Sequence, residues 1–134
     1  MTIEWREINS VNVQELDEQH KKLVAIINKL FAVKPDDEAG ISAVIKELED
    51  YAEVHFKTEE EYFVKFNYEK AAEHLKLHQA YREKIISFRQ QIAALEDKYQ
   101  IFSDLLEFLH EWWVGHINGA DQEYTKFFNQ QGLF

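Results

Sequence analysis

The chain has 134 residues and a formal net charge of −10, because 25 acidic side chains outnumber 15 basic ones. This acidic balance argues against binding to nucleic acid or to an anionic membrane surface, where basic side chains supply the attraction. The chain has no cysteine, which excludes disulfides, thiolate metal sites and cysteine nucleophiles. It has only four glycines and one proline, and so few helix-breaking residues favour long helices over many short strands.

Apolar residues make up 46% of the chain, which is enough to build a core. Because the sequence contains no repeat or linker, its length predicts one domain over residues 1–134. No apolar run approaches the ~18 residues of a membrane-spanning helix, and the first seven residues lack the apolar middle of a signal peptide. We therefore expect a soluble, cytoplasmic protein without membrane insertion.

The apolar pattern predicts an extended arm and then four long helices. Residues 1–12 show no clear period, and Trp5 and Ile8 are available to pack against the body. Helical spacing of apolar residues follows at about 13–33, 38–66, 69–95 and 100–118. A short helix at about 120–129 and a tail complete the chain. Four helices joined by short loops predict an all-α fold, an up-down-up-down antiparallel four-helix bundle with an N-terminal arm and a short C-terminal helix.

Polar side chains stand on the apolar faces of all four predicted helices. Five histidines lie on stripes that otherwise consist of leucine, isoleucine, phenylalanine and alanine: His20, His55, His74, His78 and His116. Glu59 follows His55 by one turn, and an ionised carboxylate in a core is costly unless it is paired or binds a metal. A single core histidine is more often just hydrogen-bonded, and Glu59 lies in a charged run typical of a solvated face. Five such histidines on four helices are hard to obtain by chance and favour a metal site inside the bundle.

The spacings within each helix support this interpretation. His55 and Glu59, and likewise His74 and His78, are four residues apart and share a helix face. Asp121 follows His116 by five residues, which is about 140° around an ideal helix and too wide for one face. For both to bind one centre, the helix must end, turn or widen into a π-bulge between them. Gly119 would lower the conformational free-energy cost of such a departure from ideal helix geometry.

Five imidazoles and two carboxylates are too many ligands for one tetrahedral zinc. They suit two metal ions bridged by the carboxylates, and imidazole is compatible with iron, zinc, copper or nickel. His110 faces elsewhere on its helix, so we expect it at the surface or at the boundary of the core. The run Glu107-x-x-His110 resembles an element of carboxylate-rich di-iron proteins, but the second copy that those proteins require is absent.

Four runs carry a resemblance to a known family: Asp17-Glu18-Gln19-His20-Lys21-Lys22-Leu23, His55-Phe56-x-x-Glu59-Glu60, His74-x-x-x-His78 and Trp112-x-x-x-His116-Ile117-x-x-x-Asp121-x-x-Tyr124. Over about residues 5–128 the sequence resembles the hemerythrins, in their single-domain bacterial form. The resemblance implies two iron ions joined by an oxo or hydroxo bridge. It assigns ligands to both irons: His74, His78 and His116 to the first, His20 and His55 to the second, and Glu59 and Asp121 as bridges. The second iron would keep one open position.

The resemblance also implies a pocket for dioxygen, lined by Leu23, Phe56, Trp112, Trp113 and Ile117. Trp113 stands where the family more often has leucine, and it could narrow the entry, place an indole N–H near the ligand, or simply fill the core. Phe63 replaces a common methionine and Asn12 a common glycine. By the same resemblance, Tyr68 and Tyr124 are expected to pack around the site rather than to bind metal.

The function that these features imply is reversible binding of dioxygen for carriage, storage or local supply, not enzymatic turnover. A histidine-rich centre with few negative ligands should favour the reduced metal. The alternatives are oxygen or redox sensing, peroxide or nitric-oxide chemistry at the same irons, and iron storage or repair. We expect a monomer, because the outward faces show no second apolar stripe. Dioxygen is the expected partner; an oxygen-using enzyme could be another, but no feature of the sequence selects one.

Overall fold

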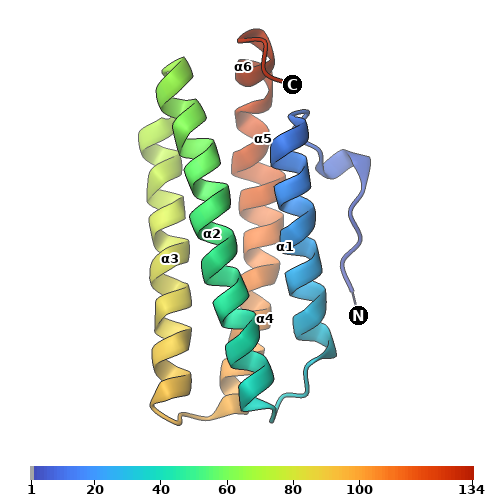
Figure 1. The fold of residues 1–134 in the computed structure, drawn as a ribbon, viewed down its shortest axis with the longest axis vertical. Helices are drawn as coiled ribbons and strands as arrows, with labels where there is room; N and C mark the ends of the chain where they lie inside the picture. Colours follow the sequence, from blue (N-terminus) through green and yellow to red (C-terminus); the bar gives the residue numbers. More distant parts are fainter. Residues whose placement is uncertain (1) are drawn as a thin grey trace.

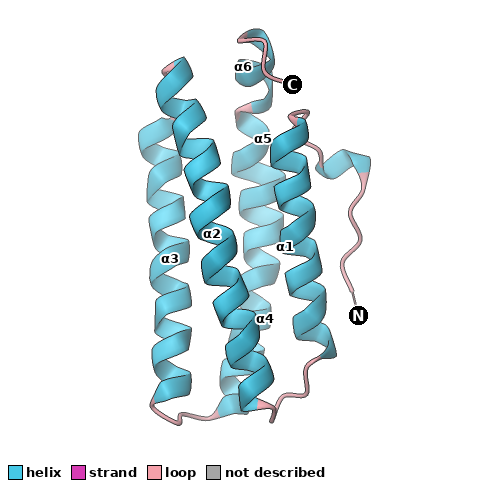
Figure 2. Ribbon diagram, viewed as in Figure 1, coloured by secondary structure: helices cyan, strands magenta, loops and turns pink. Residues whose placement is uncertain are grey.

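The computed structural model describes residues 2–134 and shows four long helices packed side by side, each antiparallel to the next (Figures 1 and 2). They are α1 (Gln14–Ala32), α2 (Glu38–Phe66), α3 (Ala71–Ala93) and α4 (Lys98–Glu111). The fourth helix continues through a π-helical segment, η2 (Trp112–Ala120), and α5 (Asp121–Glu123), before α6 (Thr125–Gln130). No strand occurs among the described residues. The predicted all-α, up-down-up-down bundle is confirmed.

The N-terminal arm runs along the outside of α1 and contains one 3-10 turn, η1 (Glu7–Asn9) (Figure 1). Asn28 of α1 holds the arm in place, because its side chain accepts from the Ile3 N–H at 2.8 Å and donates to the Ile3 carbonyl at 2.9 Å. Trp5 packs against the core as expected. The prediction for Ile8 is wrong: its side chain is 83% exposed, because the η1 turn directs it to solvent.

Helix boundaries follow local capping chemistry. The Asp37 carboxylate caps α2 by accepting from the Gly40 N–H at 3.0 Å, and Asp97 caps α4 by accepting from Tyr99 at 3.0 Å. Asn67 ends α2 in the left-handed conformation, with φ of 53°, which asparagine adopts more readily than most residues.

Two predicted helix ends are wrong. The third helix ends at Ala93 rather than residue 95, because Leu95 adopts a left-handed φ of 58°. The fourth does not stop at residue 118; its helical backbone runs on through Asp121. Because η2 runs directly into α5, Asp121 lies on the same continuous helical backbone as His116, and the C-terminal helix α6 begins only at Thr125.

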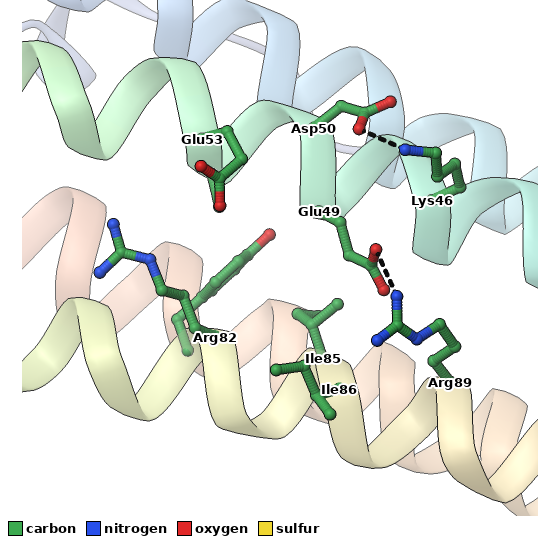
Figure 3. Close-up of a pocket in the computed structure, with 10 residues that line it drawn as sticks. Lys46, Glu49, Asp50, Glu53, Arg82, Ile85, Ile86 and Arg89 are labelled. Carbon is green, nitrogen blue, oxygen red and sulfur yellow. Dashed lines mark hydrogen bonds and ion pairs between the residues drawn. The ribbon is translucent and has the colours of Figure 1, made fainter.

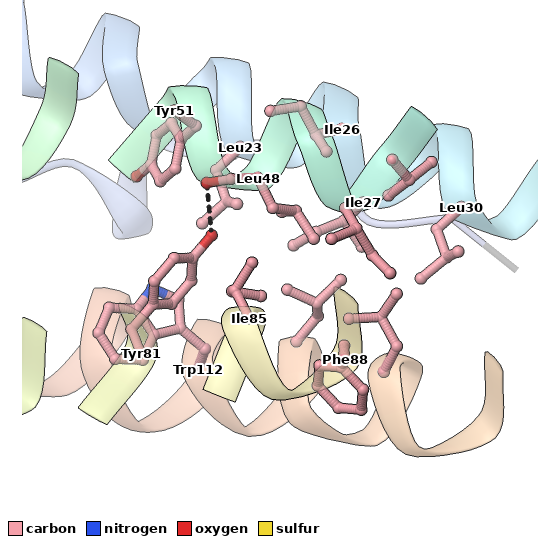
Figure 4. Close-up of a cluster of buried hydrophobic side chains, with 14 of the residues drawn as sticks. Leu23, Ile26, Ile27, Leu30, Leu48, Tyr51, Tyr81, Ile85, Phe88 and Trp112 are labelled. Atoms are coloured by element: carbon pink, nitrogen blue, oxygen red, sulfur yellow. Dashed lines mark hydrogen bonds between the residues drawn. The ribbon is translucent and has the colours of Figure 1, made fainter. Parts of the chain in front are cut away.

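Two apolar clusters fill the bundle and leave a polar layer between them. The larger contains Leu23, Leu48 and Phe88 (Figure 4) and includes Ile92 and Ile101, on either side of the α3–α4 turn. The smaller contains Leu16 and Phe63, at the end that carries α6. Each helix passes from one cluster to the other, and its histidines lie in between. Among residues 2–134, no helix is long and apolar enough to cross a membrane.

Candidate metal centre

All seven side chains that the sequence analysis proposed as ligands lie in this polar layer. Each is at most 4% exposed, and together they make up the buried polar or charged residues recorded for the described chain: His20, His55, Glu59, His74, His78, His116 and Asp121. They come from α1, α2, α3, η2 and α5. The structure therefore brings together residues that are up to 101 positions apart in the sequence.

Three histidines converge on one side of the layer. The Nε2 atom of His78 lies 3.0 Å from Oε1 of Glu59, and those of His74 and His116 lie 2.8 and 2.9 Å from Oδ1 of Asp121. One donor atom from each of these five residues lies within 4.8 Å of all the others. Such a group can hold one ion through three nitrogens and two oxygens.

Two histidines converge on the other side. The Nε2 atoms of His20 and His55 are 3.1 Å apart, and they lie 3.1 Å from Oδ2 of Asp121 and 3.4 Å from Oε1 of Glu59, respectively. These four residues form a second group with donor atoms within 4.8 Å. Both groups contain Glu59 and Asp121, so the two carboxylates stand where they can bridge two ions. The second group offers one nitrogen fewer than the first.

The layer fits metal ions better than it fits internal hydrogen bonding. Both oxygens of Glu59 and of Asp121 are buried without a hydrogen-bond partner, and so are the Nε2 atoms of His74, His78 and His116. These oxygen and nitrogen atoms lie close to one another, but their relative orientations do not give good hydrogen bonds. Buried polar atoms without partners are costly and uncommon. Cations placed between these atoms would satisfy them together, and imidazole with carboxylate is a donor set that suits iron.

The backbone of η2 explains how His116 and Asp121 reach the same centre. The Asp121 N–H donates to the carbonyls of His116 and Gly119, and the bond to a residue five positions earlier is the π-helical pattern. Of the three departures considered from the sequence, an end, a turn or a widening of the helix, the structure shows the widening. Gly119 is not needed for it, because its φ is not positive and an added Cβ would meet only the Val114 carbonyl, at 3.8 Å.

Further polar side chains orient two of the histidines. The Nδ1 atom of His55 lies 2.6 Å from Oε1 of Gln19, whose amide nitrogen donates to Thr58 at 3.0 Å. The Nδ1 atom of His78 lies 2.8 Å from the Glu60 carboxylate. A proton held on Nδ1 leaves Nε2 free to bind a metal. Gln19 and Glu60 received no role in the sequence analysis, although each is the chain neighbour of a proposed ligand.

Arg82 connects this arrangement to a surface groove between α2 and α3. Its guanidinium donates to Glu60 at 3.4 Å, and it lines a cavity of about 290 Å³ (Figure 3). Other charges in the groove pair with one another, Arg89 with Glu49 at 3.0 Å and Lys46 with Asp50 at 2.7 Å. The groove therefore presents little uncompensated charge, and Arg82 acts chiefly by supporting Glu60 behind His78.

Burial and mutual proximity shift the pKa values of the proposed ligands in opposite directions. Burial lowers the pKa of His55 to about 3, which keeps its imidazole neutral. Burial also opposes protonation of His74, but the adjacent Asp121 and Glu59 outweigh it and raise the pKa of His74 to about 10. For both carboxylates, burial acts to raise the pKa, yet the surrounding histidines hold it below the ordinary range. The layer thus keeps two anions in the core, which favours cation binding.

This arrangement predicts that the metal-free protein loses stability at alkaline pH. The pKa of His74 is about 10 in the fold and about 6.5 when unfolded, so its stabilising proton is fully present below pH ~6.5 and is lost as the pH rises toward 10. The melting temperature in chelator should fall between about pH 7 and about pH 9.5. The His74→Asn variant should show a flatter profile, and a parent profile with no slope in this range would contradict the assignment.

The five predicted pocket residues are all buried. The rings of Phe56 and Trp112 stack on His78 and His116, in each case with centroids 3.8 Å apart. They therefore hold proposed ligands in place as well as excluding water. Trp113 meets Trp5 of the arm edge-on at 6.4 Å, so it fills the space between the arm and the core.

Tyr51 is a further residue at this side of the layer, and the sequence analysis missed it. Its ring stacks on that of His55, with centroids 5.1 Å apart. Burial, together with the nearby Tyr81 and the two carboxylates, raises the pKa of the Tyr51 hydroxyl well above its ordinary value. Tyr51 precedes His55 by one turn, as Glu59 follows it, so the spacing gives its place on this face of α2 but not the environment of its hydroxyl.

Other residues singled out by the resemblance have clear structural places. Tyr124 and Phe63 pack against His74 with centroids 5.7 and 4.9 Å away, and Tyr68 stacks on Phe63. Asn12 adopts a left-handed φ of 53°, a conformation that glycine reaches most easily. His110 is exposed, as predicted.

Comparison with known proteins places the whole bundle in one family. The family described as the hemerythrin HHE cation-binding domain matches residues 11–128. A bacteriohemerythrin of Clostridium acetobutylicum is 32% identical over 126 residues, which cover 90% of this chain and 96% of the relative. A hemerythrin-like protein of Naegleria gruberi is 31% identical over 120 residues, which cover 90% and 88%. The crystal structure of a wild-type hemerythrin superposes with a TM-score of 0.80 at 26% identity, covering 94% of this chain and 97% of that one.

Proposed function

The chain belongs to the hemerythrin family, and from that premise we propose that it binds dioxygen reversibly at a buried centre of two iron ions. The observation that carries the proposal is the pair of overlapping donor groups, buried and without adequate hydrogen bonds, that share Glu59 and Asp121. In this proposal His74, His78 and His116 hold one iron, and His20 and His55 hold the other. The two carboxylates bridge them.

The unequal number of nitrogens decides where a small molecule can bind. The His20–His55 side has one protein donor fewer than the three-histidine side, so an ion held there would have a position available for an exogenous ligand. A bound pair of ferrous ions would supply the two electrons that dioxygen takes up on binding and returns on release.

The surroundings of the centre favour binding over turnover. Leu23, Phe56, Trp112, Trp113 and Ile117 belong to the large apolar cluster, and their burial excludes the water that would carry protons to a reduced ligand. Tyr51 adds a hydroxyl that holds its proton at neutral pH as any tyrosine does, and burial raises its pKa further. We propose that this chain releases dioxygen unchanged rather than converting it.

An oxygenation cycle tests the proposed function. The protein is loaded with ferrous iron without air, its iron is counted, and dioxygen is admitted and then removed under argon. We expect an optical absorption that appears with dioxygen and disappears without it over several cycles. His20→Ala should abolish the response by removing one of the two nitrogens on the open side, while His110→Ala, at an exposed histidine, should leave it unchanged. Immediate irreversible oxidation of the parent protein would contradict reversible binding.

A further inference from the structure

The hydroxyl of Tyr51 is buried without a hydrogen-bond partner. The residue is 7% exposed, and its oxygen is fully enclosed. Tyr81, at the same level of the bundle, offers a direct contrast, because its hydroxyl donates to the Leu48 carbonyl at 3.1 Å (Figure 4). A buried hydroxyl that makes no hydrogen bond costs free energy. The hydroxyl of Tyr51 is therefore available to a partner other than the protein itself.

The position of Tyr51 shows where that partner would lie. On α2, Tyr51 stands one turn before His55, and its ring is nearly parallel to the imidazole, at an interplanar angle of 15°. On the antiparallel α1, Leu23 stands one turn after His20. In both helices, moving one turn from the histidine to this residue leads from the polar layer toward the large apolar cluster, which contains Leu23 and Tyr51. Tyr51 thus places a hydroxyl beside the His20–His55 side, at the border of the large apolar cluster.

A surface groove leads to this same place. A cavity of about 330 Å³ opens between α1 and α2, and His55 and Tyr51 form part of its wall. Val54 lies on its rim and is 58% exposed. A molecule of two or three atoms that enters there meets Tyr51 and His55.

We propose that Tyr51 is a ligand-positioning residue whose hydroxyl donates a hydrogen bond to a small ligand on the His20–His55 side. The ligand class is dioxygen or a linear anion such as azide, each of which has an atom that accepts a hydrogen bond. In an apolar wall such a bond is stronger than in water. The inference rests on the proposed function, because it requires metal at that side of the centre.

The test compares Tyr51→Phe with the matched control Tyr81→Phe, using azide as the probe on the oxidised, iron-loaded protein. We expect Tyr51→Phe to raise the azide dissociation constant about tenfold, or ~1.4 kcal/mol, mainly through faster dissociation. Tyr81→Phe removes a hydroxyl that is already committed to Leu48 and should leave azide affinity within about twofold.

Two further readouts separate positioning from a structural role. In the parent protein the vibrational frequency of bound azide should shift in D₂O, and this shift should vanish in Tyr51→Phe. Without azide, Tyr51→Phe should keep or raise the melting temperature, because it removes an unpaired hydroxyl, whereas Tyr81→Phe should lower it by about 3–6 °C. Unchanged azide affinity in a Tyr51→Phe protein that holds both irons, or a parent without a D₂O shift, would overturn this inference alone. A parent protein that does not bind two irons would instead contradict the proposed function.

Discussion

Asp121→Asn is expected to leave the protein with at most one iron per chain and to weaken iron binding by at least about a hundredfold. The loss should exceed the ~10–100-fold that follows removal of a residue which merely supports a metal ligand. Asp121 contacts the Nε2 atoms of His20, His74 and His116 at 3.1, 2.8 and 2.9 Å, so it belongs to both halves of the proposed centre. Asparagine keeps the shape of the side chain but removes one of the two buried anions.

Iron content after anaerobic loading, together with competition against a chelator, measures this effect. Glu123→Gln is the matched control, because Glu123 lies two residues later on α5 and its carboxylate is solvent-exposed. It should retain two irons per chain. If Asp121→Asn also retained two irons with the affinity of the parent, the bridging role of Asp121 would be wrong.

Trp112→Ala is expected to lower the free energy of unfolding by about 3–5 kcal/mol, the usual loss when a buried tryptophan is truncated. Trp112 stacks on His116 at 3.8 Å and packs against Tyr81 and Phe56 at 4.8 and 5.8 Å. Its removal opens a cavity in the large apolar cluster and frees one face of a proposed ligand. The same variant should therefore lose iron faster to a chelator than the parent protein does.

Urea unfolding of the iron-loaded protein checks the stability of this variant. The midpoint should move to lower urea with an unchanged slope, because the surface exposed on unfolding remains nearly the same. Tyr99→Ala is the control, since Tyr99 is 58% exposed, and it should change stability by no more than about 0.5 kcal/mol. A Trp112→Ala loss below about 1 kcal/mol would show that Trp112 contributes little to the core.

The fold and the polar layer were accessible from the sequence because both depend on helical periodicity. His20 and His55 fall on stripes of leucine and alanine, and such stripes must face the core. The scarcity of glycine and proline allowed the helices to be long. The sequence also showed that the helix must depart from ideal geometry between His116 and Asp121, but it left open whether the helix ends, turns or widens there.

Features that depend on packing could not be predicted in this way. In the sequence, Tyr51 looks like an ordinary residue of the apolar helix face. Only the structure shows that its hydroxyl lacks a hydrogen-bond partner. Gln19 and Glu60 are polar residues beside proposed ligands, and their roles depend on side-chain directions across two helices. Leu95 ends α3 in a conformation that leucine rarely adopts, so nothing in the local sequence marked that boundary.

Seven buried side chains are proposed to hold two metal ions that share two carboxylates. Diffraction from crystals of the iron-loaded protein, with data collected on both sides of the iron absorption edge, would locate these ions. We expect two anomalous peaks per chain, one among His74, His78 and His116 and one beside His20 and His55, with Glu59 and Asp121 between them. A single peak, or iron bound away from this layer, would show that the proposed two-metal centre is wrong.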